Sequence, residues 1–251
     1  MRRHELTDDE WEIIEPLLPR SSRGVPRVDD RRVINGILWR FRTGSPWRDV
    51  PERYGPRTTL YNRFVRWRAA GVWDRLLRSV SEAYDGDIVM IDSSCVRVHQ
   101  HGAAVKRGAD DGCMGRSRGG LTTKIHALVD AAGRPMRLSL TPGQAGDAPE
   151  AVPLMADLDA GATLIADRAY DTNAIRDHAE DAGIWANIPP RSIRKQSFPF
   201  SRWVYRQRNL VERFFNRLKQ FRGIATRYDR RPDNFLAALK LASIRIWLAD
   251  L

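Results

Sequence analysis

Two short apolar runs that each end in an aspartate constrain the fold of this chain more than any other feature. They are Asp87-Ile-Val-Met-Ile-Asp92 and Ala162-Thr-Leu-Ile-Ala-Asp167. Short, nearly all-apolar runs are typical of central strands in a sheet. Because open α/β sheets place their active crevice at the carboxyl ends of strands, the runs predict that Asp92 and Asp167 lie at such an edge. The alternative is that each aspartate only caps the next turn or helix.

The elements around these runs alternate between strands and helices. Further strands are expected over residues 122–130 and 135–141, which form a hairpin, and over residues 184–188. Helices are expected over residues 148–158, 172–182, 205–219 and 234–248. This order predicts an α/β domain, residues 85–251, with a mixed sheet and flanking helices.

The first 84 residues follow a helical period instead. The segment opens with the capping box Thr7-Asp-Asp-Glu10, and residues 20–28 form a basic loop. Helices are expected over residues 8–18, 29–42, 47–54, 58–69 and 73–80. This succession of short helices and turns is typical of a helix-turn-helix, so residues 1–84 are expected to form a helical DNA-binding region.

One helix of this region has the pattern of a DNA-reading helix. Its apolar residues are Leu60, Phe64 and Trp67, and the opposite face carries Thr59, Asn62, Arg63 and Arg66. Such a face can enter a major groove. The alternative is a plain helical subdomain with a solvated basic face.

Composition favours a polyanionic partner. The net charge is +11 with a pI near 10.3, and only five of the 42 basic residues are lysines, which favours nucleic acid over a membrane surface. Only two cysteines occur, Cys95 and Cys113, as expected of a protein from a reducing cytoplasm. No apolar run approaches the roughly 18 residues of a membrane span.

A third carboxylate stands on a helix stripe near the C-terminus. Tyr205, Arg208, Glu212 and Lys219 are spaced by 3, 4 and 7 residues and share an arc of about 60°. The opposite side carries the apolar residues Leu210, Phe214, Leu218 and Phe221. The helix can therefore dock on a core while presenting one carboxylate flanked by cations. The alternative is an ordinary solvated helix face with i,i+4 partners.

Asp92, Asp167 and Glu212 together define a candidate metal site. Three carboxylates without a histidine or cysteine partner favour Mg²⁺ or Mn²⁺ over zinc. Such a site can hold two ions about 4 Å apart for an in-line displacement at a phosphodiester.

Several other polar residues are weaker candidates. A zinc site from Cys95, His99, His101 and Cys113 is disfavoured because the spacing fits no standard finger. His126 lies either beside the active site or within the sheet as a satisfied histidine. Asp147 and Asp171 are more consistent with helix caps than with metal ligands. A glycine-rich loop flanked by Arg116, Arg118 and Lys124 either grips DNA or is merely solvated.

The pattern Tyr205-x₂-Arg208-x₃-Glu212-x₆-Lys219, preceded by Asp92 and Asp167, resembles the signature of DDE transposases of bacterial insertion sequences, and within these the IS-five branch. Further matching stretches are Leu6-Thr-Asp-Asp-Glu-Trp, Glu15-Pro-Leu-Leu-Pro19, Gly44-Ser-Pro-Trp-Arg-Asp-Val-Pro51, Ile91-Asp-Ser-Ser94, Gly119-Gly-Leu-Thr-Thr-Lys-Ile-His126, Pro142-Gly-Gln, Ala166-Asp-Arg-Ala-Tyr-Asp171, Asn234-Phe-Leu-Ala and Ile244-Arg-Ile-Trp247. The resemblance spans almost the whole chain.

The resemblance implies a ribonuclease-H-like fold in which Asp92, Asp167 and Glu212 are the first, second and third acid. It implies cutting of DNA at terminal inverted repeats and joining of the freed 3′-hydroxyl to target DNA, in the bacterial cytoplasm at the nucleoid. Arg208 and Lys219 would contact phosphates, and Tyr205 would help place the DNA end. Pairing of two ends implies a homodimer or higher oligomer.

Two rival functions are a related-fold nuclease that cuts without joining and a non-catalytic DNA-binding regulator. The intact acids argue against the second.

Overall fold

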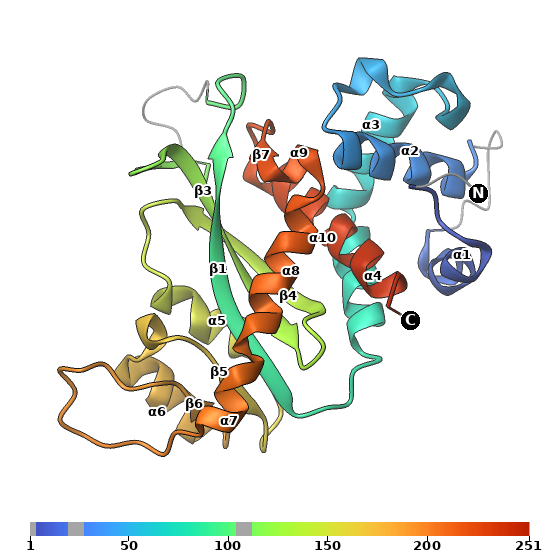
Figure 1. The fold of residues 1–251 in the computed structure, drawn as a ribbon. Coiled ribbons are helices and arrows are strands. Elements are labelled where there is room, and N and C mark those ends of the chain that lie inside the picture. Colours follow the sequence, from blue (N-terminus) through green and yellow to red (C-terminus); the bar gives the residue numbers. More distant parts are fainter. Residues whose placement is uncertain (1–3, 20–27, 104–111, 251) are drawn as a thin grey trace.

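A helical N-terminal region lies beside a mixed sheet with helices on both faces (Figure 1). The computed structural model describes residues 4–19, 28–103 and 112–250. Residues 20–27, which make up most of the basic loop expected at 20–28, lie outside the described residues. No helix in the described ranges is long and apolar enough to cross a membrane.

The described residues of the N-terminal region form four α-helices. They are α1 (Asp8–Ile14), α2 (Asp30–Thr43), α3 (Arg57–Ala69) and α4 (Val72–Ser81). The predicted capping box of α1 is confirmed, because the Glu10 amide donates to Thr7 Oγ1 at 3.0 Å and the Thr7 amide donates to Glu10 Oε2 at 2.8 Å. The helix expected over residues 47–54 is instead two 3₁₀ turns, 47–49 and 52–54, separated by Pro51, which has no amide donor.

The sheet has the ribonuclease-H-like strand order β4-β3-β1-β5-β6. The strands on this path are β1 (Ile88–Val98), β3 (Gly120–Asp130), β4 (Pro135–Pro142), β5 (Thr163–Ile165) and β6 (Trp185–Asn187). The first three are antiparallel, and β5 and β6 run parallel to β1. Two short strands, β2 (Gly115–Ser117) and β7 (Thr226–Arg227), pair with β3 and β1. The predicted fold class is confirmed.

The strand that carries Asp92 is longer than predicted. Its parallel pairing with β5 ends at Met90 opposite Ile165, but its antiparallel pairing with β3 continues to Arg97 opposite Thr122. The expectation that the strand ends at Asp92 is therefore wrong, because the polar residues after it are still paired with β3. Asp92 nevertheless lies two residues beyond the last β1–β5 pair, at the edge where β5 ends.

Six helices of the C-terminal part cover the sheet. They are α5 (Ala151–Met155), α6 (Asn173–Asp181), α7 (Arg202–Tyr205), α8 (Asn209–Lys219), α9 (Arg222–Ala225) and α10 (Pro232–Leu248). The helix expected over residues 148–158 is shortened to a 3₁₀ turn followed by α5. The helix expected over residues 205–219 is divided by a 3₁₀ turn over residues 206–208.

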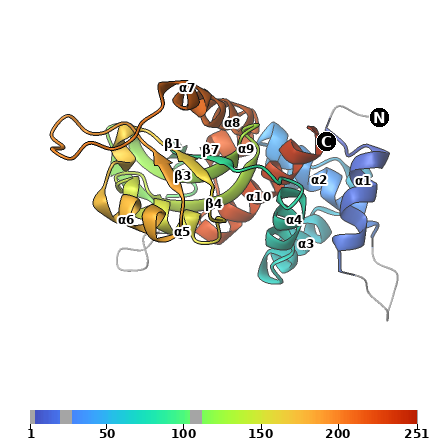
Figure 2. The same cartoon turned by 90° about the horizontal axis from the view of Figure 1, so that it is seen from below.

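Two apolar cores lie on opposite faces of the sheet (Figure 2). Along β1, Met90 points to the core shared with α8 and α10, whereas Val89 and Ile91 point to the core under α5 and α6. The α8 side also includes the N-terminal helices, and α10 packs against α4. The division between residues 84 and 85 stays a prediction.

Candidate active site

Three separate elements bring the predicted acids together. Asp92 follows Met90 by two residues on β1 and so projects to the face that α8 covers. Asp167 follows the last residue of β5 by two positions, so the parallel register sets it level with Asp92. Glu212 lies in the first turn of α8, which docks on the sheet through the buried Val211, Phe214, Phe215 and Leu218. We call the three acids with Arg208 the acid cluster.

A single guanidinium lies between the three carboxylates. Nη2 of Arg208 is 2.8 Å from Oδ2 of Asp92 and 3.7 Å from Oδ2 of Asp167. Nη1 of the same side chain is 2.7 Å from Oε1 of Glu212. One cationic group therefore reaches all three acids at once.

The charges of the acid cluster do not balance. Burial raises the pKa of Asp92, and the positive charge of Arg208 opposes that rise. Burial lowers the pKa of Arg208, but the charges of Asp92, Tyr205, Asp167 and Glu212 together raise it more. Three acids around one guanidinium leave an excess of two negative charges, which favours a further cation.

The donor set of the acid cluster fits a hard divalent cation. All of its acidic ligands are carboxylate oxygens, which suit Mg²⁺ and Mn²⁺. As the side chains lie in this structure, no group of three or more His, Cys, Asp or Glu residues in the described ranges is arranged to hold a metal ion. In the acid cluster, the Arg208 guanidinium stands where the three carboxylates converge.

The predicted zinc alternative gains no support. The rings of His99 and His101 are 4.7 Å apart, and the His99 ring also packs on Tyr228 at 4.6 Å. Cys95 is exposed, and its thiol approaches only the Gly143 carbonyl oxygen, at 3.8 Å. These residues do not form a metal-binding group within the described ranges.

Lys219 and Tyr205 flank the acid cluster differently. Nζ of Lys219 donates to Oγ of Ser94, two residues after Asp92 on β1, at 2.6 Å. The Tyr205 ring packs against Phe200, with 5.3 Å between ring centroids. Lys219 thus lies beside the strand of the first acid, whereas Tyr205 lies against the segment before α7.

A polar network behind Asp92 was not predicted. Oγ of Ser93 donates to Oδ1 of Asp147 at 2.7 Å, and Nζ of Lys124 lies 2.7 Å from the same oxygen. Burial raises the pKa of Asp147, but Lys124 and Ser93 lower it further, so the pKa is below its ordinary value. The network fixes β1 next to Asp92. Its members lie on facing segments, and their proximity depends on strand register, which residue spacing alone does not give.

Two predicted roles change with this network. The expectation that Asp147 caps a helix is wrong, because its side chain makes no cap bond and is held by Ser93 and Lys124. Lys124 is therefore engaged rather than free to grip DNA. His126 is buried on β3 and its Nε2 is 2.8 Å from Oγ1 of Thr141, while burial lowers its pKa. It is a buried sheet histidine that pairs in register with Ser93.

Asp171 is a buried anchor and not a helix cap. Its Oδ1 accepts from Nε of Arg176 at 2.7 Å, and its Oδ2 accepts from Nε of Arg194 at 2.8 Å and from the Arg191 amide at 2.7 Å. Thr172, not Asp171, caps α6. We call this group the Asp171 cluster. It fastens the loop after β6, and the long sequence separation of Arg191 and Arg194 from Asp171 hid it from sequence reasoning.

Family models match nearly all of the chain. Residues 6–77 match the model described as "Putative transposase of IS4/5 family", and residues 83–247 match the model described as "Transposase DDE domain". The chain belongs to the DDE transposase family. DNA transposition is accordingly its function, and members of this family generally use divalent metal ions.

Two curated relatives are similar to this chain, and one of them is described as a putative transposase. The transposase is 40% identical over 130 residues to the "Putative transposase for insertion sequence element IS6501" of Brucella ovis, a match that covers 51% of this chain and 99% of the relative. It is 40% identical over 118 residues to the "Uncharacterized protein y4sN" of Sinorhizobium fredii, covering 46% of this chain and 94% of the relative.

Solved structures of transposases are also similar. A piggyBac transposase synaptic complex with hairpin DNA has a TM-score of 0.48 at 11% identity, covering 94% of this chain and 68% of that chain. A Mos1 transposase paired-end complex with left transposon end has a TM-score of 0.29 at 14% identity, covering 92% and 82%. These similarities concern the overall fold only.

The predicted DNA-reading face of the transposase is only partly free. On α3, Asn62 and Arg66 are exposed and Thr59 is half-buried. Arg63 instead forms an ion pair with Asp30 of α2, and its guanidinium lies 5.2 Å from the centre of the Trp67 ring. Arg116 and Arg118 lie at the start of the β2–β3 hairpin, away from any contact with the three acids among the described residues.

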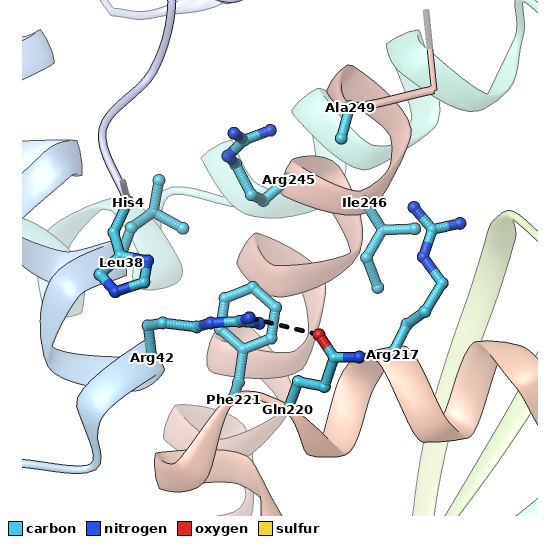
Figure 3. Close-up of a pocket in the computed structure, with 9 residues that line it drawn as sticks. All are labelled: His4, Leu38, Arg42, Arg217, Gln220, Phe221, Arg245, Ile246 and Ala249. Atoms are coloured by element: carbon cyan, nitrogen blue, oxygen red, sulfur yellow. Dashed lines mark hydrogen bonds between the residues drawn. The ribbon is translucent and has the colours of Figure 1, made fainter. Parts of the chain in front are cut away.

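A separate cavity of about 200 Å³ lies where α2, α8 and α10 meet (Figure 3). Its walls carry the arginines Arg42, Arg217 and Arg245 together with the apolar Leu38, Phe221 and Ile246. Arg217 is paired with Asp250, and Arg245 with Glu10. None of the three acids lines this cavity, so it is separate from the acid cluster.

Proposed function

We propose that Asp92, Asp167 and Glu212 are the catalytic acids with which the transposase cuts DNA at terminal inverted repeats and joins the 3′-hydroxyl to target DNA. The observation that carries this proposal is the single guanidinium that touches all three carboxylates. Acids from two strands and one helix converge on one point, with an excess of negative charge around it. That is the environment a divalent cation needs beside a phosphodiester.

The acid cluster would hold Mg²⁺ or Mn²⁺, with two ions per site. When bound, the metal supplies an activated attacking oxygen and stabilises the leaving oxygen. Asp92, Asp167 and Glu212 orient it through carboxylate oxygens. The Ser93–Asp147–Lys124 network keeps β1 rigid, so that Asp92 stays in place.

The cations of the helix stripe would then serve the DNA. Arg208 lies close enough to the acids to turn from a carboxylate to a phosphate oxygen held between them. Lys219, tied to Ser94, is placed to contact a neighbouring phosphate. Tyr205, packed on Phe200, would place the DNA end.

Residues 1–84 would recognise the DNA, with catalysis in residues 85–251. Asn62, Arg66 and Thr59 would face the major groove, while Arg63 would hold the reading helix on α2 through Asp30. Two DNA ends must be brought together, so a homodimer or higher oligomer is expected. The reaction would take place at the bacterial nucleoid, in the cytoplasm.

The test uses a labelled duplex carrying the inverted repeat that flanks the gene, with Mg²⁺ or Mn²⁺. Wild type should give cut and joined products, whereas Asp92→Asn, Asp167→Asn and Glu212→Gln should give neither. Asp181→Asn is the matched control, because Asp181 is an exposed carboxylate at the end of α6. If the three variants cut like wild type, the assignment of the acids fails. Cutting without joining would indicate the nuclease alternative, and binding without cutting in Mn²⁺ the regulator.

A further inference from the structure

An exposed tryptophan, Trp203, stands in the short helix that precedes α8, the helix of Glu212. Trp203 is 72% exposed, although most large apolar side chains of this protein are buried. It lies in α7, and Figure 2 shows this helix at the outer edge of the molecule, after the long loop that follows β6. Single exposed apolar side chains are ordinary on protein surfaces, so the anchoring of Trp203 and the charges beside it decide what the indole can bind.

Hydrogen bonds hold the chain on the N-terminal side of Trp203 in place. Oγ of Ser201 accepts from the Val204 amide and so caps α7. Ser201 is itself held to β6, since its amide donates to Oδ1 of Asn187 at 2.8 Å and its carbonyl accepts from Nδ2 of Asn187 at 3.1 Å. The Asp171 cluster fastens the preceding loop. The indole is therefore presented by an anchored helix start and not by a loose loop.

Free arginines continue from Trp203 toward the catalytic acids. Arg202, Arg206 and Arg213 are exposed, and their guanidinium groups make no hydrogen bond or ion pair within the described residues. By contrast, Arg208 and Arg217 on the same helical run are both paired with carboxylates. The sequence contains no Asp or Glu from residue 182 to residue 211. The charge of this surface is therefore not neutralised locally.

The free arginines and Trp203 share one face of the helical run. With about 100° per α-helical residue and 120° per residue in the 3₁₀ turn, the exposed residues fall within an arc of about 120°. They are Arg202, Trp203, Arg206, Asn209, Glu212, Arg213 and Asn216. We call this face the exposed stripe. It borders the stripe of Arg208 and Lys219, with Glu212 on the border.

We propose that the exposed stripe carries a DNA strand away from the catalytic acids, and that Trp203 stacks on an unpaired base of that strand. The proposal rests on the proposed function, because it takes the scissile phosphate to lie at Glu212. Arg202, Arg206 and Arg213 supply the positive charges that phosphates require. The base faces in a duplex are covered by their neighbours, so an indole can stack only on an unpaired or terminal base.

The spacing along the stripe sets where that base lies. Trp203 and Glu212 are nine residues apart, which is about 15 Å along the helical run. A stacked strand advances about 3.4 Å per nucleotide. The stacked base should therefore lie about four nucleotides from the scissile phosphate.

The test compares two 20-base-pair duplexes in EDTA, one blunt and one with a five-nucleotide single-stranded thymidine overhang, by fluorescence anisotropy. Wild type should prefer the overhang. Trp203→Leu should lose that preference by roughly 5- to 150-fold, the range for one stacked base, while binding the blunt duplex normally. Trp203→Phe should keep most of it. Trp185→Leu is the matched control, because Trp185 is exposed on β6 and lies off the stripe.

The contribution of the arginines is measured separately, from the affinity for DNA and its dependence on salt. Arg206→Ala and Arg213→Ala should weaken binding to both duplexes and reduce the slope of log affinity against log salt by about 0.7 to 0.9 each. Arg78→Ala should leave the slope unchanged. Arg78 on α4 is likewise exposed and unpaired within the described residues.

The outcomes separate this proposal from the proposed function. If wild type cuts transposon ends and prefers the overhang, yet Trp203→Leu behaves like wild type, the stacking proposal is wrong and the function stands. An equal loss on both duplexes also overturns stacking. So does a self-association without DNA that Trp203→Leu abolishes, because the indole would then serve a protein interface. If wild type binds neither duplex, the proposed function itself fails.

Discussion

The acid cluster and the Asp171 cluster use the same two residue types in opposite proportions. In the acid cluster three carboxylates surround one arginine, whereas in the Asp171 cluster one carboxylate is held by two guanidiniums and a backbone amide. Glu212 is 55% exposed in its side chain, while the side chain of Asp171 is 0% exposed. A buried carboxylate whose two oxygens both accept hydrogen bonds from the protein is structural, whereas carboxylates in excess of their cations can accept a ligand.

The difference also separates stability from activity. The acid cluster has more carboxylates than cations, so its residues should matter for chemistry and little for folding. The Asp171 cluster is buried and satisfied, so removing a partner should matter for folding. The predictions that follow test this division.

The largest effect is expected for the acids themselves. Glu212→Gln should lower metal-dependent cleavage by about 10³-fold or more, because it removes one charged ligand from the cluster. Its thermal unfolding midpoint should remain within a few degrees of wild type, since Glu212 lies at the surface. A single-turnover cleavage assay and a circular-dichroism melt measure the two quantities. A large fall in Tm with normal cleavage would reverse the roles of the two clusters.

Asp171→Ala should destabilise the fold by about 3–5 kcal/mol, because it leaves Arg176 and Arg194 without their carboxylate in a closed site. That corresponds to a fall in Tm on the order of 10 °C. Urea titration and thermal melts would measure it, with Asp181→Ala as the exposed control. Cleavage by the folded fraction, measured well below the melting point, should stay near the wild-type rate. A Tm equal to that of wild type would show that the Asp171 cluster is not structural.

A substitution of Arg208 tests the same comparison by removing the cation of the acid cluster. Arg208→Gln should reduce cleavage by about 10²-fold through loss of a phosphate contact. The same change should tighten metal binding in the absence of DNA by about tenfold, because the guanidinium competes for the carboxylates. Terbium luminescence titration reads the metal affinity directly. Arg194→Gln, the matched change in the Asp171 cluster, should alter Tm and leave metal affinity unchanged; unaltered terbium binding in Arg208→Gln would refute the competition.

The elements of the fold could be predicted because their signals are local. The apolar runs before Asp92 and Asp167, the turn over residues 131–134 and the capping box at Thr7 each depend on neighbouring residues. Prolines in the segments that begin near Trp47 and Ala148 shortened the helices expected there. Strand length past Asp92 was missed because pairing with β3, and not apolar character, extends β1.

The partners of the site residues could not be predicted, because they depend on register and on distant segments. The three acids were named from strand ends and a helix stripe, which are sequence patterns. The position of Arg208 between them, however, needs the docking of α8 on β1. Arg63 shows the same limit. Its place on the helix face predicted a contact with DNA, whereas in the structure it is paired with Asp30 of α2.

The smallest predicted effect concerns folding stability, which Asp171 and Asp92 should change in opposite directions as the pH rises. The pKa of Asp171 is lowered in the folded protein, because its bonds to the Arg191 amide, Arg176 and Arg194 outweigh burial. Its stabilising contribution is therefore complete above about pH 4 and is lost as the pH falls below that value. The pKa of Asp92 is raised, chiefly by burial, so ionised Asp92 costs stability once the pH rises through that folded pKa.

Asp92→Asn should consequently stabilise the metal-free protein at pH 7, by about 1 kcal/mol or less. This gain should vanish below about pH 4, where the carboxyl group of Asp92 is as uncharged as the amide that replaces it. Asp171→Asn should instead destabilise at pH 7 and approach wild type in acid. Urea titrations in EDTA at pH 3.5, 5 and 7 would measure both variants. The two curves should diverge from wild type in opposite directions as the pH rises. A variant Asp92→Asn that is less stable than wild type at pH 7 would mean that Arg208 stabilises the wild-type Asp92 carboxylate as its partners stabilise Asp171. The distinction between an unsatisfied and a satisfied cluster would then be lost.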